Sequence, residues 1–90
     1  MMKLLNQEYN LIKDNTDGFN LEEVSSLVTD YFKDYDYIVG DYAYSKLRLK
    51  GFTKKENKLN NSINDYKNLD KYIKENCAYG CRYFVLEKIN

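Results

Sequence analysis

The stretch YDYIVGDYAYSKLRLKGF, residues 35 to 52, decides the fold of this chain. Residues 36 to 41 and 46 to 52 are two runs rich in aromatic and aliphatic side chains, and four residues connect them. In the second run, leucines alternate with lysine and arginine, which is typical of a strand with one buried and one exposed face. The stretch therefore predicts a β-hairpin.

The pairing of this hairpin depends on the length of its loop. If residues 42 to 45 form the loop, Gly40 lies opposite Leu47 and Ile38 opposite Leu49, so that one face is aliphatic. A two-residue turn at positions 40 and 41 is the alternative, and we favour it less because it leaves Ile38 opposite Ala43. On the other face, the four-residue loop pairs Asp41 with Lys46, Val39 with Arg48, Tyr37 with Lys50, and Tyr35 with Phe52.

A strand and a helix are expected before the hairpin. Residues 7 to 13 predict a short strand, and the run DNTDG at 14 to 18 predicts a turn. Asn20 can cap a helix, and Glu23 lies three residues later, as in a capping box. The apolar side chains that follow recur at helical spacing and form one wide stripe: Leu21, Val24, Leu27, Val28, Tyr31, Phe32 and Tyr35.

A loop, a second helix and a last strand are expected after the hairpin. Residues 53 to 61 are almost wholly polar and predict a mobile loop. Ser62, with Asp65 three residues later, marks a helix start, and Gly80 can end that helix. Residues 81 to 89 predict a strand that is apolar on both faces and therefore central. The apolar side of the second helix would hold Ile63, Tyr66, Leu69, Tyr72, Ile73 and Cys77.

These elements predict one α+β domain over residues 1 to 90, with the element order β-α-β-β-α-β. We expect a mainly antiparallel sheet with two helices packed on it. The same order occurs in ferredoxin-like sandwiches, in which the helices lie on one face of the sheet.

Composition limits where the protein works and what it binds. No run approaches the roughly 18 apolar residues of a membrane span, and residues 1 to 5 are too short for the apolar region of a signal peptide, so we expect a cytoplasmic protein. The formal net charge is +0, which argues against a strongly basic nucleic-acid binder. However, residues 14 to 36 are mainly acidic and residues 46 to 58 mainly basic, which predicts one acidic and one basic face.

Several blocks of the sequence form a specific pattern: residues 35 to 41, residues 47 to 52, Cys77, Gly80 with Cys81, and residues 83 to 87. Together these blocks resemble the YutD-like family of small proteins from Gram-positive and related bacteria. The sequence departs from the family pattern at residues 42 to 44, where Tyr-Ala-Tyr stands in place of Trp-Gly-Tyr. The resemblance covers nearly the whole chain and implies a small cytoplasmic α+β protein, but it implies no catalytic or binding residues.

The non-aliphatic face of the hairpin combines aromatic rings with cations, a combination that stacks nucleic-acid bases and contacts phosphates. The alternative is that the cations are the solvated side of an ordinary half-buried sheet, with the aromatic rings covering their stems. Lysines in the following loop extend the basic region. The candidate nucleic-acid-binding residues are Tyr35, Tyr37, Lys46, Arg48, Lys50, Phe52, Lys54, Lys55 and Lys58.

Cys77 and Cys81 are weak candidates for metal ligands or a redox pair. Zinc normally requires four ligands and the chain has no histidine, so a metal site would need a second copy of the chain. The alternative, which we favour, is that both cysteines are buried small apolar residues, kept reduced. No cofactor is expected.

Catalysis is not expected either. The commonest general base, histidine, is absent, and no phosphate-binding glycine loop or nucleophile motif occurs. Asp41 is the one candidate carboxylate, and the simpler expectation is an ion pair with Lys46. The sequence therefore favours a non-catalytic binding module that contacts RNA or a ribonucleoprotein. The alternative is a protein-interaction or regulatory module, or a homodimerising adaptor, in which the acidic first helix or exposed tyrosines contact the partner.

Overall fold

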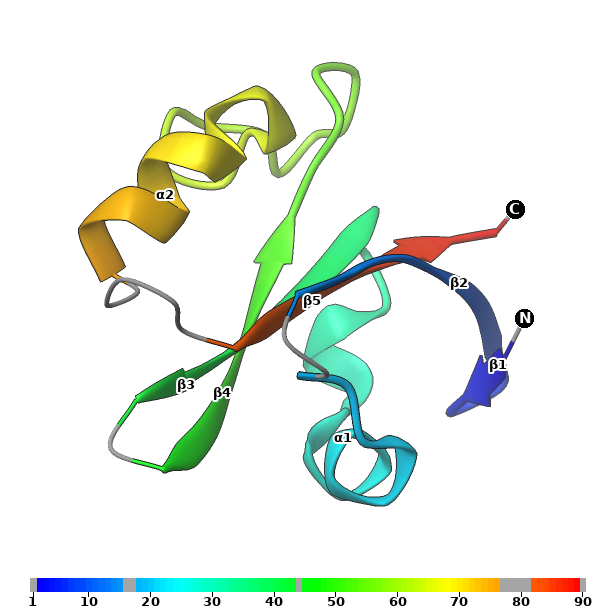
Figure 1. The fold of residues 1–90 in the computed structure, drawn as a ribbon. Helices are drawn as coiled ribbons and strands as arrows, with labels where there is room; N and C mark the ends of the chain where they lie inside the picture. The colour runs from blue at the N-terminus through cyan, green and yellow to red at the C-terminus, as the bar shows by residue number, and fades with distance from the viewer. Residues whose placement is uncertain (1, 16–17, 44, 77–81, 90) are drawn as a thin grey trace.

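The sheet is built around β5 (Tyr83–Lys88), the strand that is apolar on both faces. The computed structural model describes residues 2–15, 18–43, 45–76 and 82–89, and Figure 1 shows them as a twisted sheet with helical segments on two sides. The other elements, in chain order, are β1 (Met2–Leu4), β2 (Gln7–Asn15), α1 (Leu21–Leu27), the 3-10 helix η1 (Asp30–Phe32), β3 (Tyr37–Ala43), β4 (Lys46–Phe52), the 3-10 helix η2 (Tyr66–Asn68) and α2 (Leu69–Asn76).

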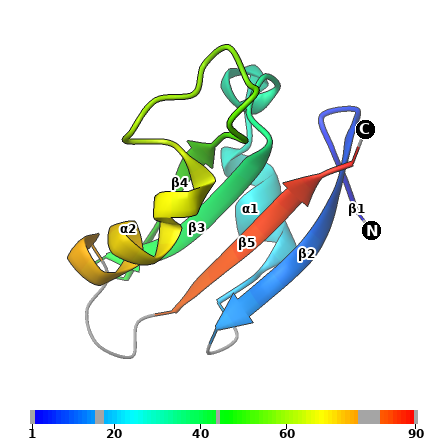
Figure 2. The same ribbon diagram turned by 90° about the horizontal axis from the view of Figure 1, so that it is seen from above.

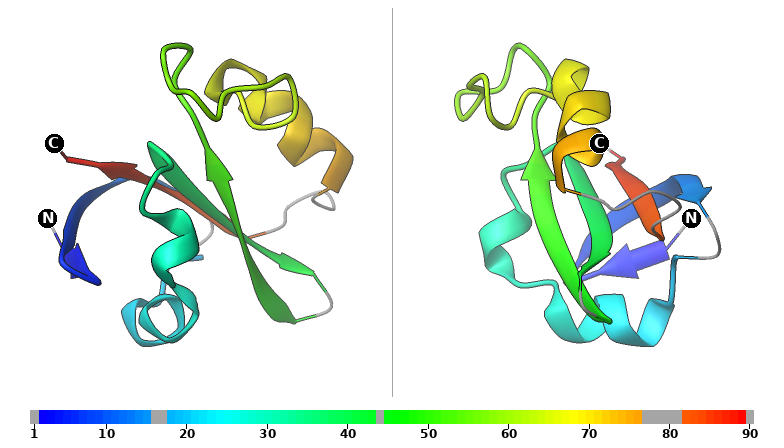
Figure 3. Two further views of the ribbon diagram at one scale, coloured as in Figure 1. Left: turned by 180° about the vertical axis from the view of Figure 1, so that it is seen from behind. Right: turned by 60° about the vertical axis from the view of Figure 1, so that its left-hand side comes forward.

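The strand order is β1-β2-β5-β3-β4, and every neighbouring pair is antiparallel. The predicted central position of the last strand is therefore confirmed. Figure 3 shows β4 at one edge of the sheet and the short β1 at the other. No helix in the described part of the chain is long and apolar enough to cross a membrane.

The two helical segments cover opposite faces of the sheet, as Figure 2 shows. The α+β class and the antiparallel sheet with two helices packed on it are confirmed. The one-face arrangement of ferredoxin-like sandwiches does not occur here, because β5 is apolar on both sides and each side needs a cover. One core lies between the sheet and the α1 segment and contains Leu4, Tyr9, Val24, Val28, Phe32, Ile38, Phe84 and Leu86. The other lies under α2 and contains Tyr37, Val39, Phe52, Leu69 and Val85.

The first helix is shorter than predicted. Asn20 caps it as expected, because its side chain accepts a hydrogen bond from the backbone N–H of Glu23 at 3.0 Å. The helix ends at Leu27, because the next residue has an extended backbone and Thr29 caps the separate helix η1. The predicted apolar stripe is therefore interrupted: Val24, Val28 and Phe32 are buried, whereas Leu21, Leu27 and Tyr31 are exposed.

The second helix begins later than predicted. Asp65 caps η2 by accepting from the backbone N–H of Lys67, and α2 follows directly. The side chain of Asn61 accepts from the N–H groups of Ile63 and Asn64, which fixes a turn where the helix was expected to start. Ile63 consequently lies on the surface instead of in the core.

The hairpin pairs Ala43 with Lys46 and Tyr37 with Phe52, which is two residues out of the predicted register. Only positions 44 and 45 separate the strands, and Ser45 has the positive φ of 66° that such tight turns need. The predicted four-residue loop is therefore wrong, and so are its pairs. A shift of two residues keeps each side chain on its face, so Leu47 and Leu49 still share a face with Ile38.

The N-terminus adds a strand that was not predicted. β1 pairs with β2 through a two-residue turn in which Leu5 and Asn6 both have positive φ, 48° and 65°. β2 runs to Asn15, beyond the predicted end at residue 13. β1 covers only residues 7 to 9 of β2, and in the described part of the chain residues 10 to 15 have β5 as their one neighbouring strand.

Candidate functional site

The aromatic residues of the predicted binding face are covered by α2 and η2. Phe52 is fully buried, with its ring edge-on to Tyr72 at 5.4 Å between centroids. Tyr37 is 7% exposed and stacks on Tyr66 at 3.8 Å. Burial, with a contribution from the nearby Glu87 carboxylate, raises the pKa of Tyr37 to about 12. These two rings belong to a core and offer no open face for stacking a nucleic-acid base.

Tyr35 lies on the other side of the sheet, with the α1 segment. Its ring packs over Gly51, where a Cβ atom would lie only 2.5 Å from the ring. Its hydroxyl lies 3.2 Å from that of Tyr31, at hydrogen-bonding distance. The structure therefore separates Tyr35 from Tyr37 and Phe52, with which it was predicted to form one face.

The three cations of β4 differ in their surroundings. The guanidinium of Arg48 donates to both carboxylate oxygens of Asp41, at 3.2 and 2.8 Å, and to the backbone carbonyl of Asn76 at 3.2 Å. Asp41 is buried, so Arg48 compensates its charge, and the predicted pairing of Asp41 with Lys46 is wrong. Lys50 lies over the rings of Phe52 and Tyr72, and Lys46 is exposed.

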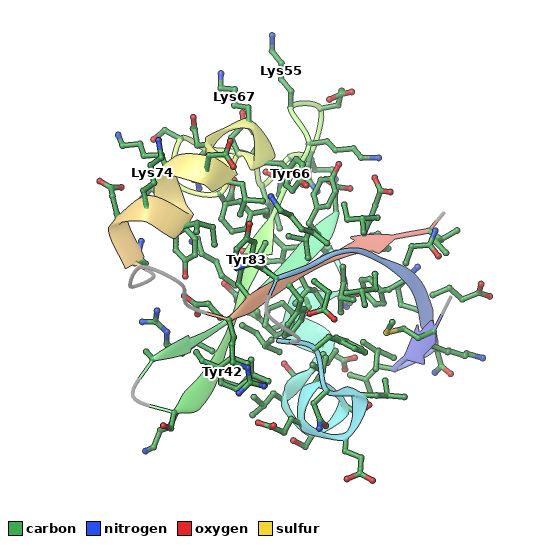
Figure 4. All side chains as sticks on the ribbon, in the orientation of Figure 1. Tyr42, Lys55, Tyr66, Lys67, Lys74 and Tyr83 are labelled. Atoms are coloured by element: carbon green, nitrogen blue, oxygen red, sulfur yellow. The ribbon has the colours of Figure 1, made fainter. Side chains whose placement is uncertain are left out.

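The lysines of the loop after β4 lie far from the hairpin turn. Lys54, Lys55 and Lys58 are exposed, and Figure 4 shows Lys55 at the tip of the loop, pointing away from the sheet. The loop itself is tied down by side-chain hydrogen bonds. The amide of Asn57 donates to Asp36, and the amide of Asn60 donates to the buried hydroxyl of Thr53. The mobility predicted for residues 53 to 61 stays a prediction.

The two cysteines lie outside the described residues. Within the residues that the structure describes, no three histidine, cysteine, aspartate or glutamate side chains are grouped so that they could hold a metal ion.

Sequence reasoning missed the outer edge of β4. This strand has one neighbour, β3, and its C-terminal end is closed by the chain itself. Thr53 donates its N–H to the carbonyl of Asn64 and accepts from the N–H of Tyr66, in a parallel bridge. Among the described residues, no such bridge continues along residues 46 to 50. We call these residues the open segment of β4.

Exposed apolar side chains flank the open segment on its α1 side. Tyr31 is 66% and Ile63 71% exposed, and Leu27 is also exposed. Leu47 and Leu49 of β4 lie between them and are partly buried. We call this set, Leu27, Tyr31, Leu47, Leu49 and Ile63, the edge patch. It comes from three parts of the chain, so only the strand order and the early end of α1 reveal it.

Two hollows lie within the edge patch. One of about 280 Å³ is bounded by Tyr31, Tyr35, Leu49 and Ile63. A second of about 370 Å³ lies beside Leu27 and Leu47. Both are open to solvent along β4 and have mixed apolar and polar linings, and shallow hollows of this kind suit the side chains of a protein partner.

Comparisons with known proteins agree with this fold. The model of a family described as "Putative antitoxin YutD-like" matches residues 3–87. A protein of Bacillus subtilis (strain 168) described as "Putative antitoxin YutD" is 43% identical over 89 residues, which make up 99% of this chain and 98% of that protein. The solution NMR structure of the B. subtilis protein yutD matches with a TM-score of 0.83 and 42% identity, and the match covers 100% of this chain and 82% of that one. The resemblance seen in the sequence is thus confirmed, and the chain belongs to the YutD-like family.

Proposed function

We propose that this protein acts by binding another protein through the edge patch, without catalysing a reaction. The observation that carries the proposal is the position of the exposed apolar side chains beside an unpaired strand edge. A contiguous apolar patch with a polar surround is typical of a protein-binding surface, whereas scattered apolar residues are not.

The name of the B. subtilis relative supports a protein as the partner. That protein is described as a putative antitoxin, and one way for an antitoxin to counter a toxin is to bind it as a protein. A partner of this kind requires a surface and no catalytic residues. The one candidate carboxylate, Asp41, fits that requirement, because it is buried and held by Arg48.

RNA binding receives less support from the geometry. Of the aromatic residues it required, Tyr37 and Phe52 are buried under α2, and Tyr35 lies on the opposite side of the sheet. Arg48 is already paired with a carboxylate. The exposed lysines of the loop remain, but without exposed rings beside them they are a common solvated surface.

Site-directed photocrosslinking tests the proposal. A photoreactive amino acid is placed at position 49, in the edge patch, and at position 3, on the opposite edge, in separate variants expressed in the source cell. We expect a protein to be captured from position 49 and not from position 3. The captured protein is then purified and its affinity is measured for the unmodified chain and for Leu27→Ser and Leu49→Ser variants.

Each substitution should weaken binding by about tenfold, because burial of a leucine side chain contributes roughly 1.5 kcal/mol or more. Lys3→Ser serves as the matched control and should leave the affinity unchanged. An affinity that is the same for all variants, or a partner captured only from position 3, would contradict the proposal.

A further inference from the structure

We infer that the partner docks as an additional β-strand on the open segment of β4, with apolar side chains on its α1 side and acidic side chains on its α2 side. This inference rests on the proposed function and specifies the conformation and chemistry of the bound segment. Strand addition of this kind takes its affinity from main-chain hydrogen bonds and its specificity from the alternate side chains.

An added strand requires main-chain N–H and C=O groups of the open segment that point outward, away from β3. Both the N–H and the C=O of Thr53 are directed outward, to Tyr66 and Asn64. The direction alternates along a strand, so Leu49 and Leu47 also direct their N–H and C=O outward, away from β3. These two residues therefore present four outward hydrogen-bonding groups. They lie within the five-residue open segment, which is about 14 Å long.

The chain already shows this mode of binding at the end of β4. Residues 64 to 66 lie against Thr53 through a single parallel bridge, with Asp65 in an extended conformation as the cap of η2. The pairing stops there, since the turn at Asn61 leads residues 61 to 63 into their own local hydrogen bonds. An incoming strand would occupy the next part of the same edge.

The surroundings of the open segment differ on the two sides of the sheet. On the α1 side, an added strand would meet the two hollows of the edge patch. On the α2 side, it would meet a hollow of about 480 Å³ bounded by Ile63, Lys71 and Tyr72. Ile63 borders hollows on both sides of the sheet. Each of the two rows of side chains on the added strand would therefore lie in a hollow.

The charges on the α2 side favour acidic side chains on that side of the added strand. Lys46 and Lys50 project from β4, and Lys71 projects from α2. Arg48 adds little, because it is paired with Asp41, and Glu75 offsets one lysine at the rim of the hollow. The balance on this side is positive, so glutamate or aspartate at alternate positions of the added strand would be favoured.

The same charges disfavour a second copy of this chain as the occupant. If two β4 strands paired antiparallel with Leu47 of each copy opposite Leu49 of the other, Lys46 of each copy would lie opposite Lys50 of the other. Like charges directly opposite one another destabilise a strand pair. Lysines on an edge strand are also a common way to prevent self-association. The patch therefore fits a partner of different sequence.

A synthetic nine-residue peptide of alternating valine and glutamate tests the inference by NMR titration of the whole protein. We expect the amide protons of Leu47 and Leu49 to exchange about tenfold more slowly with the peptide bound, since each gains a hydrogen bond. A peptide of alternating valine and lysine is the matched probe for charge, and it should bind about tenfold more weakly.

Protein variants separate strand addition from side-chain contact. Leu49→Pro removes an outward N–H without removing a hydrogen bond to β3, and it should weaken peptide binding about tenfold more than Leu49→Ala does. A Leu49→Pro protein that fails to fold leaves the exchange experiment to decide. Equal effects of the two variants, unchanged exchange at Leu47 and Leu49, or equal binding of both peptides overturns strand addition. The photocrosslinking result does not depend on any of these outcomes, so the two proposals fail separately.

Discussion

The two ends of β4 belong to one continuous strand with alternating faces but have opposite surroundings. At its C-terminal end, Gly51, Phe52 and Thr53 are buried, α2 covers one face, and residues 64 to 66 close the edge. In the open segment, α2 covers less of the strand and nothing described closes the edge. The comparison teaches that alternation defines the two faces of a strand, whereas neighbouring elements decide which part of each face is core.

Phe52→Ala tests the closed end most directly. The ring is fully buried between the sheet and α2, so we expect a loss of about 3 to 5 kcal/mol in the free energy of unfolding. The measurement is urea denaturation, with Leu49→Ala as the control in the open segment. Leu49 is only partly buried, so its loss should be less than half as large. Equal losses would erase the distinction between the two ends.

Alkaline pH should also act on the closed end, through Tyr37. Its folded-state pKa of about 12 lies above the value of 10.0 for an unperturbed tyrosine, mainly because of burial. The unfolded state therefore ionises first, so the stability is fully present below pH 10 and is lost as the pH rises toward 12. We expect the unfolding free energy to fall by about 2 kcal/mol more between pH 9 and 11.5 in the unmodified protein than in Tyr37→Phe. If the unfolding free energy of Tyr37→Phe depends on pH in the same way as that of the unmodified protein, the pKa of Tyr37 does not differ between the folded and unfolded states.

The ion pair of Asp41 and Arg48 lies between the two ends. Arg48→Met leaves a buried carboxylate without its partner, and we expect a loss of about 2 kcal/mol, reduced from the value for a fully buried pair because the Arg48 side chain is 46% exposed. Adding Asp41→Asn should recover part of this loss. Urea denaturation of the two single variants and the double variant gives the coupling directly. Strictly additive losses would mean that the pair contributes nothing as a pair.

Asn64→Ala tests the closure of the edge. The side-chain oxygen of Asn64 accepts from the Thr53 hydroxyl and from the N–H of Asn61, both at 2.8 Å, and its amide donates to the carbonyl of Leu59. Loss of these buried contacts should cost about 1 to 2 kcal/mol and speed amide exchange at Thr53 and Tyr66. Lys58→Ala, in the exposed part of the same loop, is the control and should change neither quantity.

The smallest effect on stability is expected in the open segment itself. Lys46→Ala removes an exposed side chain, so the unfolding free energy should change by less than about 0.5 kcal/mol. Binding of the valine–glutamate peptide should nevertheless weaken and become less sensitive to salt. Thermal denaturation and a titration at two ionic strengths measure the two effects. A large loss of unfolding free energy would show that the Lys46 side chain contributes to the packed part of the protein.

Much of the fold could be predicted because its signals are local. The bounds of β4, the two apolar faces of β5 and the cap at Asn20 each follow from neighbouring residues. The hairpin register could not be predicted, because Ser45 adopts a positive φ. Glycine or asparagine usually indicates such a turn, and neither occurs at positions 44 and 45. The end of α1 was missed for a similar reason, since Thr29 replaces helical hydrogen bonds with a cap of its own.

The candidate site was harder to predict, because it depends on contacts between distant segments. The sequence correctly placed Tyr37, Phe52 and Lys50 on one face, but alternation does not say what covers that face. That cover is α2, and its position on this face follows from the whole fold and from no local pattern. The open segment is invisible without the strand order, since only that order makes β4 an edge.

The edge of β2 sets a limit on how these molecules can assemble. A sheet that is extendable at both edges can polymerise, because each added strand offers a new edge to the next. At the edge opposite β4, β1 covers residues 7 to 9 of β2, and the register of β2 against β5 is irregular between Leu11 and Lys13. Such irregularities bend a strand and oppose further pairing at an edge. We therefore expect strand addition at β4 to give complexes of one-to-one stoichiometry that stop growing, even at the high local concentrations at which open sheets form fibres.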